Sequence, residues 1–272
     1  MIDTTHIDSN EYILGERFES ELLDIPFVFY SKIDFVYDFL QKSKYINNPF
    51  VLVTHNGDLP VSQNLVNFAK TVPNLKKWFG QNIECQNEQL VQSIPIGLEN
   101  GYNWTKFNKT TLLRQSVLDK CKQEPKKLLY LNFSFSTNTK ERNDCYKTVS
   151  NRVNPNALTD RCVSNVEQNE YPNWLDDVMN HHYVLCPRGN GLDTHRLWET
   201  LYCGRIPILK IDTNNIYYRD LPILFVNEWE EITEQLLKDN IDRFSIAENF
   251  NTNKLKFSWW KKRIATTLKD LQ

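Results

Sequence analysis

A glycine-rich loop joins a predicted buried strand to a predicted helix in the second half of the 272-residue chain. Gly189 and Gly191 leave the backbone open to close approach by a ligand. The helix that follows adds free N–H groups and the positive end of its dipole, both suited to phosphate oxygens. Side-chain donors in the same segment are Arg188, His195 and Arg196. Together these features predict a site for a diphosphate.

A carboxylate lies one helical turn behind these donors. Glu199 follows His195 by four residues, so the two share a helix face, and Glu199 is placed to accept hydrogen bonds from ribose hydroxyls. Asn190 and Thr194 complete the polar side chains of the segment, and Asp193 is the predicted N-cap. The competing interpretation is a tight turn followed by a solvated helix face. The concentration of donors around one strand–helix connection favours the ligand site.

The segment from Tyr183 to Leu209, YVLCPRGNGLDTHRLWETLYCGRIPIL, resembles the C-terminal signature of exostosin-like glycosyltransferases. In that family a Cys-Pro-Arg-Gly loop precedes an Arg-x-x-Glu helix, which is followed by Gly-x-Ile-Pro and a strand. The resemblance implies an α/β fold of the GT-B type, with two Rossmann-like domains facing a cleft. It assigns Arg188, Arg196 and Glu199 to the binding of a nucleotide-sugar donor. Outside this segment the likeness is much weaker, so the acceptor stays open.

A second polar loop follows the predicted strand 128–133 and leads into a predicted helix over 140–149. Its side chains can face the same diphosphate from across the sheet. These further donor-site candidates are Asn132, Ser134, Asn138 and Arg142. The alternative, equally supported, is an Asn or Ser helix cap with a solvated arginine.

Transfer of a sugar with inversion needs a general base, and a base is expected at the carboxyl end of a strand in the first half. The predicted strand 50–54 runs directly into His55 and Asp58. Asp58 is the first candidate and His55 the second. The alternative is a type I′ turn at Asn56-Gly57 after which Asp58 caps the next element.

Short apolar runs alternate with helical stretches along the chain, which is typical of parallel βαβ units. We place the domain boundary between about residues 100 and 125. Residues 1–110 are then an acceptor-side Rossmann-like domain and residues 111–272 a Rossmann-like domain that binds the nucleotide sugar. Predicted strands cover 27–30, 50–54, 128–133, 183–186, 206–209 and 223–226, with shorter extended pieces at 82–84 and 93–96. Predicted helices cover 34–41, 62–68, 111–122, 140–149, 173–180, 194–203, 230–238 and 258–271.

The last predicted helix, 258–271, carries Trp259 and Trp260 beside a basic cluster. Two interpretations are open: a basic amphipathic helix on an anionic membrane surface, or, more commonly, a terminal helix that packs its aromatics on the core, here against the first domain. The polar start of the chain and the lack of any run of about 18 apolar residues predict a soluble, cytoplasmic protein.

Composition narrows the function classes further. Basic and acidic side chains are balanced, 32 against 34, which gives no overall field to hold nucleic acid. The five histidines form no metal-ligand spacing with carboxylates, so no metal and no cofactor besides the nucleotide-sugar co-substrate is expected.

The sequence thus predicts an inverting, metal-independent hexosyl- or pentosyltransferase that uses a nucleoside-diphosphate sugar, preferably a UDP-sugar, and a glycan acceptor. One alternative is a GDP-fucose-type fucosyltransferase, which typically has a lysine where Arg196 stands. The other is a catalytically silent nucleotide- or carbohydrate-binding protein that lacks the base.

Overall fold

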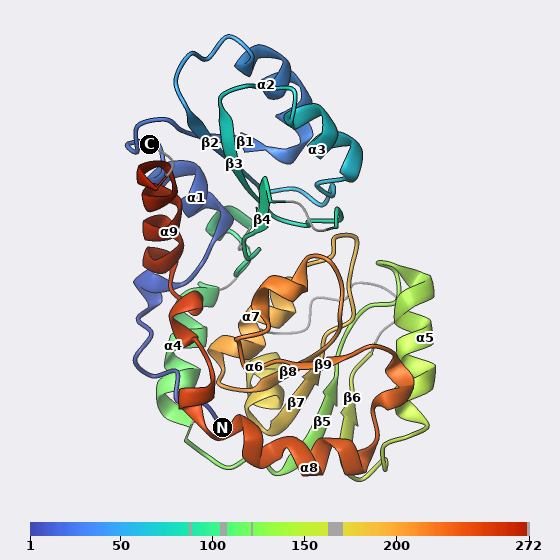
Figure 1. The fold of residues 1–272 in the computed structure, drawn as a ribbon. Coiled ribbons are helices and arrows are strands. Elements are labelled where there is room, and N and C mark those ends of the chain that lie inside the picture. Colours follow the sequence, from blue (N-terminus) through green and yellow to red (C-terminus); the bar gives the residue numbers. More distant parts are fainter. Residues whose placement is uncertain (87–88, 104–107, 121, 163–170, 271–272) are drawn as a thin grey trace.

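Two parallel β-sheets form the framework of the protein (Figure 1). The computed structural model describes residues 1–86, 89–103, 108–120, 122–162 and 171–270. The first sheet has the strand order β1-β2-β3-β4 and the second β6-β5-β7-β8-β9. All paired strands run parallel, which confirms the predicted α/β class. We call the part that carries β1–β4 the first half and the part from Lys109 to Leu255 the second half.

The first sheet is built from residues before 100. Its strands are β1 (Val28–Lys32), β2 (Phe50–His55), β3 (Leu75–Gly80) and β4 (Val91–Ser93). Its helices are α1 (Gly15–Glu21), α2 (Val36–Ser43) and α3 (Gln63–Ala69). Neither α1 nor β3 is predicted by the sequence: α1 lies in an acidic stretch, and two lysines interrupt the apolar pattern of β3. Ser62 caps α3 as the sequence pattern suggests, because its side chain accepts from the Leu65 N–H.

The second sheet follows the predicted alternation closely. Its strands are β5 (Lys127–Leu131), β6 (Leu158–Asp160), β7 (His181–Leu185), β8 (Ile206–Lys210) and β9 (Leu224–Val226). The accompanying helices are α4 (Lys109–Lys120), α5 (Thr139–Ser150), α6 (Tyr171–Met179), α7 (His195–Tyr202) and α8 (Glu234–Phe244). Because β6 lies outside β5, the chain leaves β5 and β7 in opposite directions, and the loops that follow these two neighbouring strands diverge. Ligands of open α/β sheets bind at such a point.

Helices cover both faces of each sheet. In the second sheet, Leu129 and Leu131 belong to the core cluster beneath α5 and α8, whereas Tyr130 and Val184 face α6 and α7. The cluster that contains Tyr130 and Val184 continues into the first half, where it includes Val53 and Phe18 of α1. One hydrophobic core therefore joins the facing sides of the two sheets.

Both ends of the chain cross between the halves. The first residues lie against the second half, where Thr4 donates to the carbonyl of Tyr202 (2.6 Å) and Arg114 donates to the carbonyls of Thr5 and Ile7 (2.9 Å each). The predicted domain 1–110 groups these residues with the first half instead. At the other end, α9 (Phe257–Lys269) returns to pack against β2 and β3, beside α1 (Figure 1).

The tryptophans of α9 pack on the protein. Trp260 is buried and donates through Nε1 to the carbonyl of Lys254 (2.9 Å), and Trp259 is half-buried with its ring edge-on to Trp260. The helix therefore directs its aromatic face to the core, the commoner of the two interpretations. No helix in the described part of the chain combines the length and the apolar character needed to cross a bilayer.

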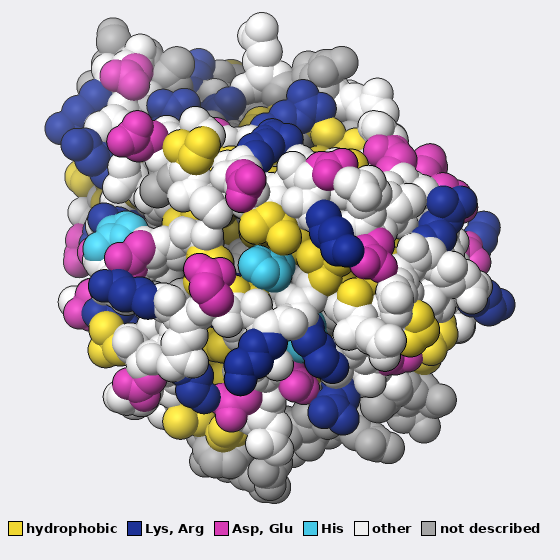
Figure 2. Space-filling model, turned by 90° about the horizontal axis from the view of Figure 1, so that it is seen from below, with side chains coloured by type: hydrophobic (Ala, Val, Ile, Leu, Met, Phe, Trp, Pro, Cys, Tyr) yellow, Lys and Arg dark blue, Asp and Glu magenta, His cyan; other side chains and the backbone are white. Residues whose placement is uncertain are grey.

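The surface beneath the second sheet mixes charges of both signs. In the view from below, Lys and Arg side chains are interspersed with Asp and Glu (Figure 2). A nucleic-acid backbone is held by a continuous basic surface, and this face does not present one.

Candidate functional site

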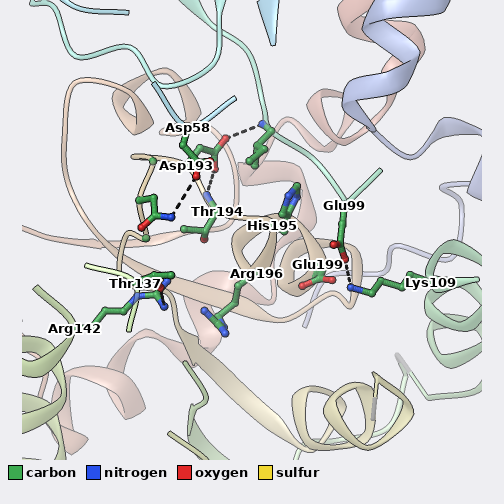
Figure 3. Close-up of a pocket in the computed structure, with 14 residues that line it drawn as sticks. Asp58, Glu99, Lys109, Thr137, Arg142, Asp193, Thr194, His195, Arg196 and Glu199 are labelled. Atoms are coloured by element: carbon green, nitrogen blue, oxygen red, sulfur yellow. Dashed lines mark hydrogen bonds and ion pairs between the residues drawn. The ribbon is translucent and has the colours of Figure 1, made fainter. Parts of the chain in front are cut away.

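A pocket of about 450 Å³ lies where the carboxyl ends of strands from both sheets meet (Figure 3). The loops after β2 and β4 supply its first-half wall, and the loops after β5 and β7 with the start of α7 supply the second-half wall. It is lined by Asp58, Ile96, Glu99, Lys109, Thr137, Arg142, Gly189, Asn190, Gly191, Asp193, Thr194, His195, Arg196 and Glu199. The pocket thus lies at the point of divergence between β5 and β7, where a ligand is expected.

The glycine loop approaches two side chains closely. A Cβ on Gly191 would lie 2.7 Å from Nδ2 of Asn82, and one on Gly189 would lie 3.1 Å from Nη2 of Arg142. Position 191 therefore needs glycine because Asn82 of the first half occupies the space that a Cβ would fill. From the sequence alone, only the close approach of a ligand explains this glycine.

Helix α7 begins one residue later than predicted. Its N-cap is Thr194, whose side chain makes no capping hydrogen bond and whose buried Oγ1 has no partner among the described residues. Asp193, the predicted N-cap, instead turns inward and accepts from the Ile96 N–H (2.8 Å), the Thr194 N–H (2.8 Å) and Nε1 of Trp198 (2.9 Å). Burial raises the pKa of the Asp193 carboxyl to about 7, although these donors oppose the shift.

Two arginines converge on one end of the pocket. Arg142 is buried and donates from Nε to the Arg188 carbonyl (3.1 Å) and from Nη1 to the Ser134 carbonyl (2.7 Å) and to Thr137. Burial, and next the charge of Arg196, lower the pKa of the Arg142 guanidinium to about 10. The buried Nε of Arg196 has no hydrogen-bond partner in the part of the chain that is described. Two neighbouring cations, one of them with an unpartnered buried donor, are expected to bind an anion.

Carboxylates gather at the opposite end of the pocket. Figure 3 shows Glu199, Glu99 and Lys109 there, away from Arg142. Glu199 is buried on α7, one turn beyond Arg196, and Lys109 forms an ion pair with Glu99 of the first half. This end of the pocket can accept hydrogen bonds from hydroxyl groups.

Several predicted donor-site residues build the loops and do not line the pocket. Asn132 donates from Nδ2 to the Tyr130 hydroxyl (2.6 Å), and Asn138 donates to the Gly189 carbonyl (3.2 Å). The Ser134 hydroxyl bonds that of Ser136 (2.8 Å). These side chains hold the loop after β5 in shape.

Arg188 points away from the pocket. Its side chain is exposed and lines a smaller cavity of about 170 Å³ on the other side of the glycine loop, together with Glu141, Asp212 and Trp229. Only its carbonyl takes part in the main site, as an acceptor from Arg142. The donor role that the family resemblance assigns to this side chain is therefore not supported by its position.

Of the two candidate bases, only Asp58 reaches the pocket. Asp58 is exposed, and its Oδ2 accepts from Nδ2 of Asn190 (3.3 Å). His55 is buried and its ring stacks on Phe18. Its Nε2 donates to the Pro95 carbonyl (3.0 Å), and its Nδ1 accepts from the Asn56 N–H (2.8 Å). Because both ring nitrogens are occupied and the side chain does not line the pocket, the position of His55 does not support the expectation that it acts as a base.

His195 connects α7 to the first half. Its Nδ1 lies 2.8 Å from the Gly97 carbonyl, so Nδ1 carries the proton and Nε2 is the acceptor in the neutral ring. Gly97 has a φ of +70°, and a Cβ there would lie 2.2 Å from the Ile13 carbonyl oxygen. The left-handed conformation of this glycine brings the acceptor carbonyl to His195.

Buried His55 and Asp193 are expected to give opposite pH dependences of stability. Burial lowers the pKa of His55 from 6.5 to about 4, so the unfolded chain binds the extra proton first and stability is lost as the pH falls through this window. The pKa of Asp193 is raised from 3.8 to about 7, so its contribution is lost as the pH rises through that range. Each contribution changes the free energy of unfolding by up to about 1.4 kcal/mol per pH unit.

Single substitutions separate the two contributions. Between pH 6.5 and 4, the unfolding free energy of Asp193→Asn should decrease more steeply on acidification than that of the wild type, because only the His55 contribution remains. The unfolding free energy of His55→Gln should instead increase on acidification, because only the Asp193 contribution remains. Urea unfolding at half-unit pH steps measures both. Parallel curves for the wild type and both variants would contradict the expectation.

Comparisons with known proteins give distant structural similarities. No family model matches the chain, and no curated protein matches it in sequence. Among solved structures, HepE of Anabaena in complex with UDP-glucose has a TM-score of 0.48 and 13% identity, over 90% of this chain and 79% of that one. The wall teichoic acid polymerase TagF has a TM-score of 0.27 and 11% identity, over 90% and 89% of the respective chains.

In the described ranges no three His, Cys, Asp or Glu side chains gather as a metal site.

Proposed function

We propose that the pocket binds a nucleoside-diphosphate sugar, preferably a UDP-sugar, and that the protein transfers the sugar to a hydroxyl of a glycan acceptor. The observation that carries the proposal is the buried Nε of Arg196 near the start of α7, which has no hydrogen-bond partner among the described residues and lies close to a second cation, Arg142 of α5. A diphosphate offers the charge and the oxygens that these groups lack. Glu199, one turn along the helix, is placed for the ribose hydroxyls.

In the proposed reaction, Asp58 takes the proton of the acceptor hydroxyl. The acceptor oxygen attacks the anomeric carbon in line, forming the new glycosidic bond with inversion. The bond between that carbon and the phosphate oxygen breaks, and its electron pair leaves with the nucleoside diphosphate. Arg142, Arg196 and the N–H groups of α7 stabilise the charge that develops on the leaving group. The proposal includes no metal.

A thermal-shift panel of UDP, GDP, CDP and their sugars, with and without EDTA, tests the proposal. A ligand at 100 times its dissociation constant should add about 2.7 kcal/mol of stability. We expect the largest shift with UDP compounds and no effect of EDTA. A preference for GDP would favour the fucosyltransferase alternative, and no response to any nucleotide would overturn the proposal.

Replacing Arg196 with alanine should weaken UDP binding by about 10- to 100-fold, because a hydrogen bond to a charged partner contributes about 1.5–3 kcal/mol. Calorimetric titration with UDP measures the change. Arg188→Ala is the matched control: it removes an arginine of the same motif whose side chain points into the other cavity. Equal losses in the two variants would mean that the bound donor also contacts Arg188, which would contradict a diphosphate site formed by Arg142 and Arg196.

Sugar-nucleotide hydrolysis separates an enzyme from a silent binder. Release of free sugar from a bound UDP-sugar requires activation of water at the position of the acceptor hydroxyl. A protein that binds UDP tightly but neither hydrolyses nor transfers from any UDP-sugar would be the silent binder.

A further inference from the structure

Asn82 is a buried side chain between the two halves that has no role in donor binding or proton transfer as described above. It lies two residues after the end of β3, is 0% exposed and has a φ of +57°, in the left-handed region that asparagine tolerates better than most residues. Oδ1 accepts from the Asp193 N–H (2.9 Å), and Nδ2 faces the carbonyls of Gly57 (3.4 Å) and Asp58 (3.5 Å).

The side-chain amide of Asn82 therefore contacts both the donor loop and the loop that carries Asp58. Its oxygen holds the backbone that precedes α7, and its nitrogen faces the backbone carbonyl of the candidate base. Gly191 leaves the space for this contact, because a Cβ there would lie 2.7 Å from Nδ2. The direct link between the same segments, from Asn190 to Asp58 (3.3 Å), is made by two exposed side chains and is weaker for that reason.

The start of α7 is also tied to the loop after β4. Asp193 accepts from the Ile96 N–H, and His195 bonds the Gly97 carbonyl. These contacts orient the helix, but they do not touch the loop that carries Asp58. Asn82 is the buried side chain that connects that loop to the donor loop within the described residues.

We propose that Asn82 is a positioning residue of the transfer reaction, which sets the separation between Asp58 and the donor loop. The assignment rests on the proposed function. The link needs both the oxygen and the nitrogen of the amide. The oxygen accepts from the Asp193 N–H, and the nitrogen donates to the carbonyls of Gly57 and Asp58. An aspartate would place an oxygen against the carbonyls of Gly57 and Asp58, and a glycine would keep the left-handed backbone while removing the link.

The test compares Asn82→Gly and Asn82→Asp with the wild type. UDP affinity is measured by calorimetry, and kcat is measured for the UDP-sugar that the wild type hydrolyses fastest in a panel of UDP-hexoses and UDP-pentoses. Turnover is expressed per UDP-binding site, so that unfolded protein does not count. We expect kcat to fall by about 10- to 100-fold, as for a misplacement of about 1 Å, while the dissociation constant of UDP changes by less than about threefold.

Asn214→Ala is the matched control. Asn214 is also a buried asparagine that joins the halves, accepting from the Ile83 N–H (2.9 Å) and the Ser93 hydroxyl (2.8 Å), but it does not line the pocket. Its loss should lower the melting temperature and leave kcat per binding site unchanged. If this control lowers kcat as much as the Asn82 variants do, the specific role of Asn82 is overturned.

The other possible outcomes of this experiment also test the positioning role of Asn82. An unchanged kcat in the Asn82 variant that folds, or equal losses of kcat and UDP affinity, would overturn the positioning role while leaving the proposed function intact. Absence of nucleotide binding by the wild type would overturn the proposed function and this assignment together.

Discussion

Replacing Asp58 with asparagine is expected to lower turnover by about 10²- to 10⁴-fold, the range that a positioned general base contributes. The amide keeps the size of the side chain and can still contact Asn190, so the pocket should keep its shape. UDP affinity should stay within about threefold of the wild type, because the arginines proposed to bind the diphosphate belong to the second half. Steady-state hydrolysis of a UDP-sugar and calorimetric titration with UDP measure the two quantities.

Asp34→Asn is the control for this experiment. Asp34 is an exposed carboxylate next to Gly57, so it shares the surroundings of the Asp58 loop, but it does not line the pocket. Its removal should leave turnover unchanged. Full activity of Asp58→Asn would exclude Asp58 as the base.

The second large effect is expected on stability. Replacing Asp193 with alanine should lower the free energy of unfolding by about 3–5 kcal/mol, since the buried Ile96 N–H, the part-buried Thr194 N–H and Nε1 of Trp198 lose their acceptor, and each unpaired buried donor costs about 1–3 kcal/mol. Asp193→Asn should cost less, because its amide oxygen still accepts. Urea unfolding at pH 6 provides the measurement.

Asp160→Ala provides the comparison at the surface. Asp160 also accepts hydrogen bonds, from the Tyr146 hydroxyl (2.7 Å) and the Cys162 N–H (2.9 Å), but it is exposed, so water replaces the lost acceptor. Its removal should change stability by less than about 1 kcal/mol. A similarly small change in Asp193→Ala would show that Asp193 does not stabilise the contact between the halves.

The secondary structure around the candidate site was predictable because it depends on local patterns. Residues 183–186 before the glycine loop are a continuous apolar run, and Gly204 follows the end of α7, so both elements appear within one residue or two of their predicted bounds. The pattern fails for β3, where the half-buried Lys76 and Lys77 interrupt the buried residues of the strand. It fails for α1 because only Gly15 and Phe18 of that helix are buried.

The direction of individual side chains was less predictable. Arg188 and Arg142 are both candidates by residue type, yet packing turns the first away from the pocket and buries the second within it. An irregular loop has no periodicity from which such directions follow. Asp193 shows the same limit, because a local capping rule places it at the helix start, whereas the Ile96 N–H and Trp198 draw it into the interior.

The sequence by itself determined that the second half is a parallel α/β unit with a glycine loop, a helix start and two arginines at one strand–helix connection. These features depend on residues that are neighbours along the chain. Only the tertiary structure decided which side chains meet there: it brings Asp58, Glu99 and Lys109 to the pocket, places Asn82 against Gly191, and confines His55 to the core. Such contacts join segments far apart in sequence, so they depend on how the two sheets pack through their shared core.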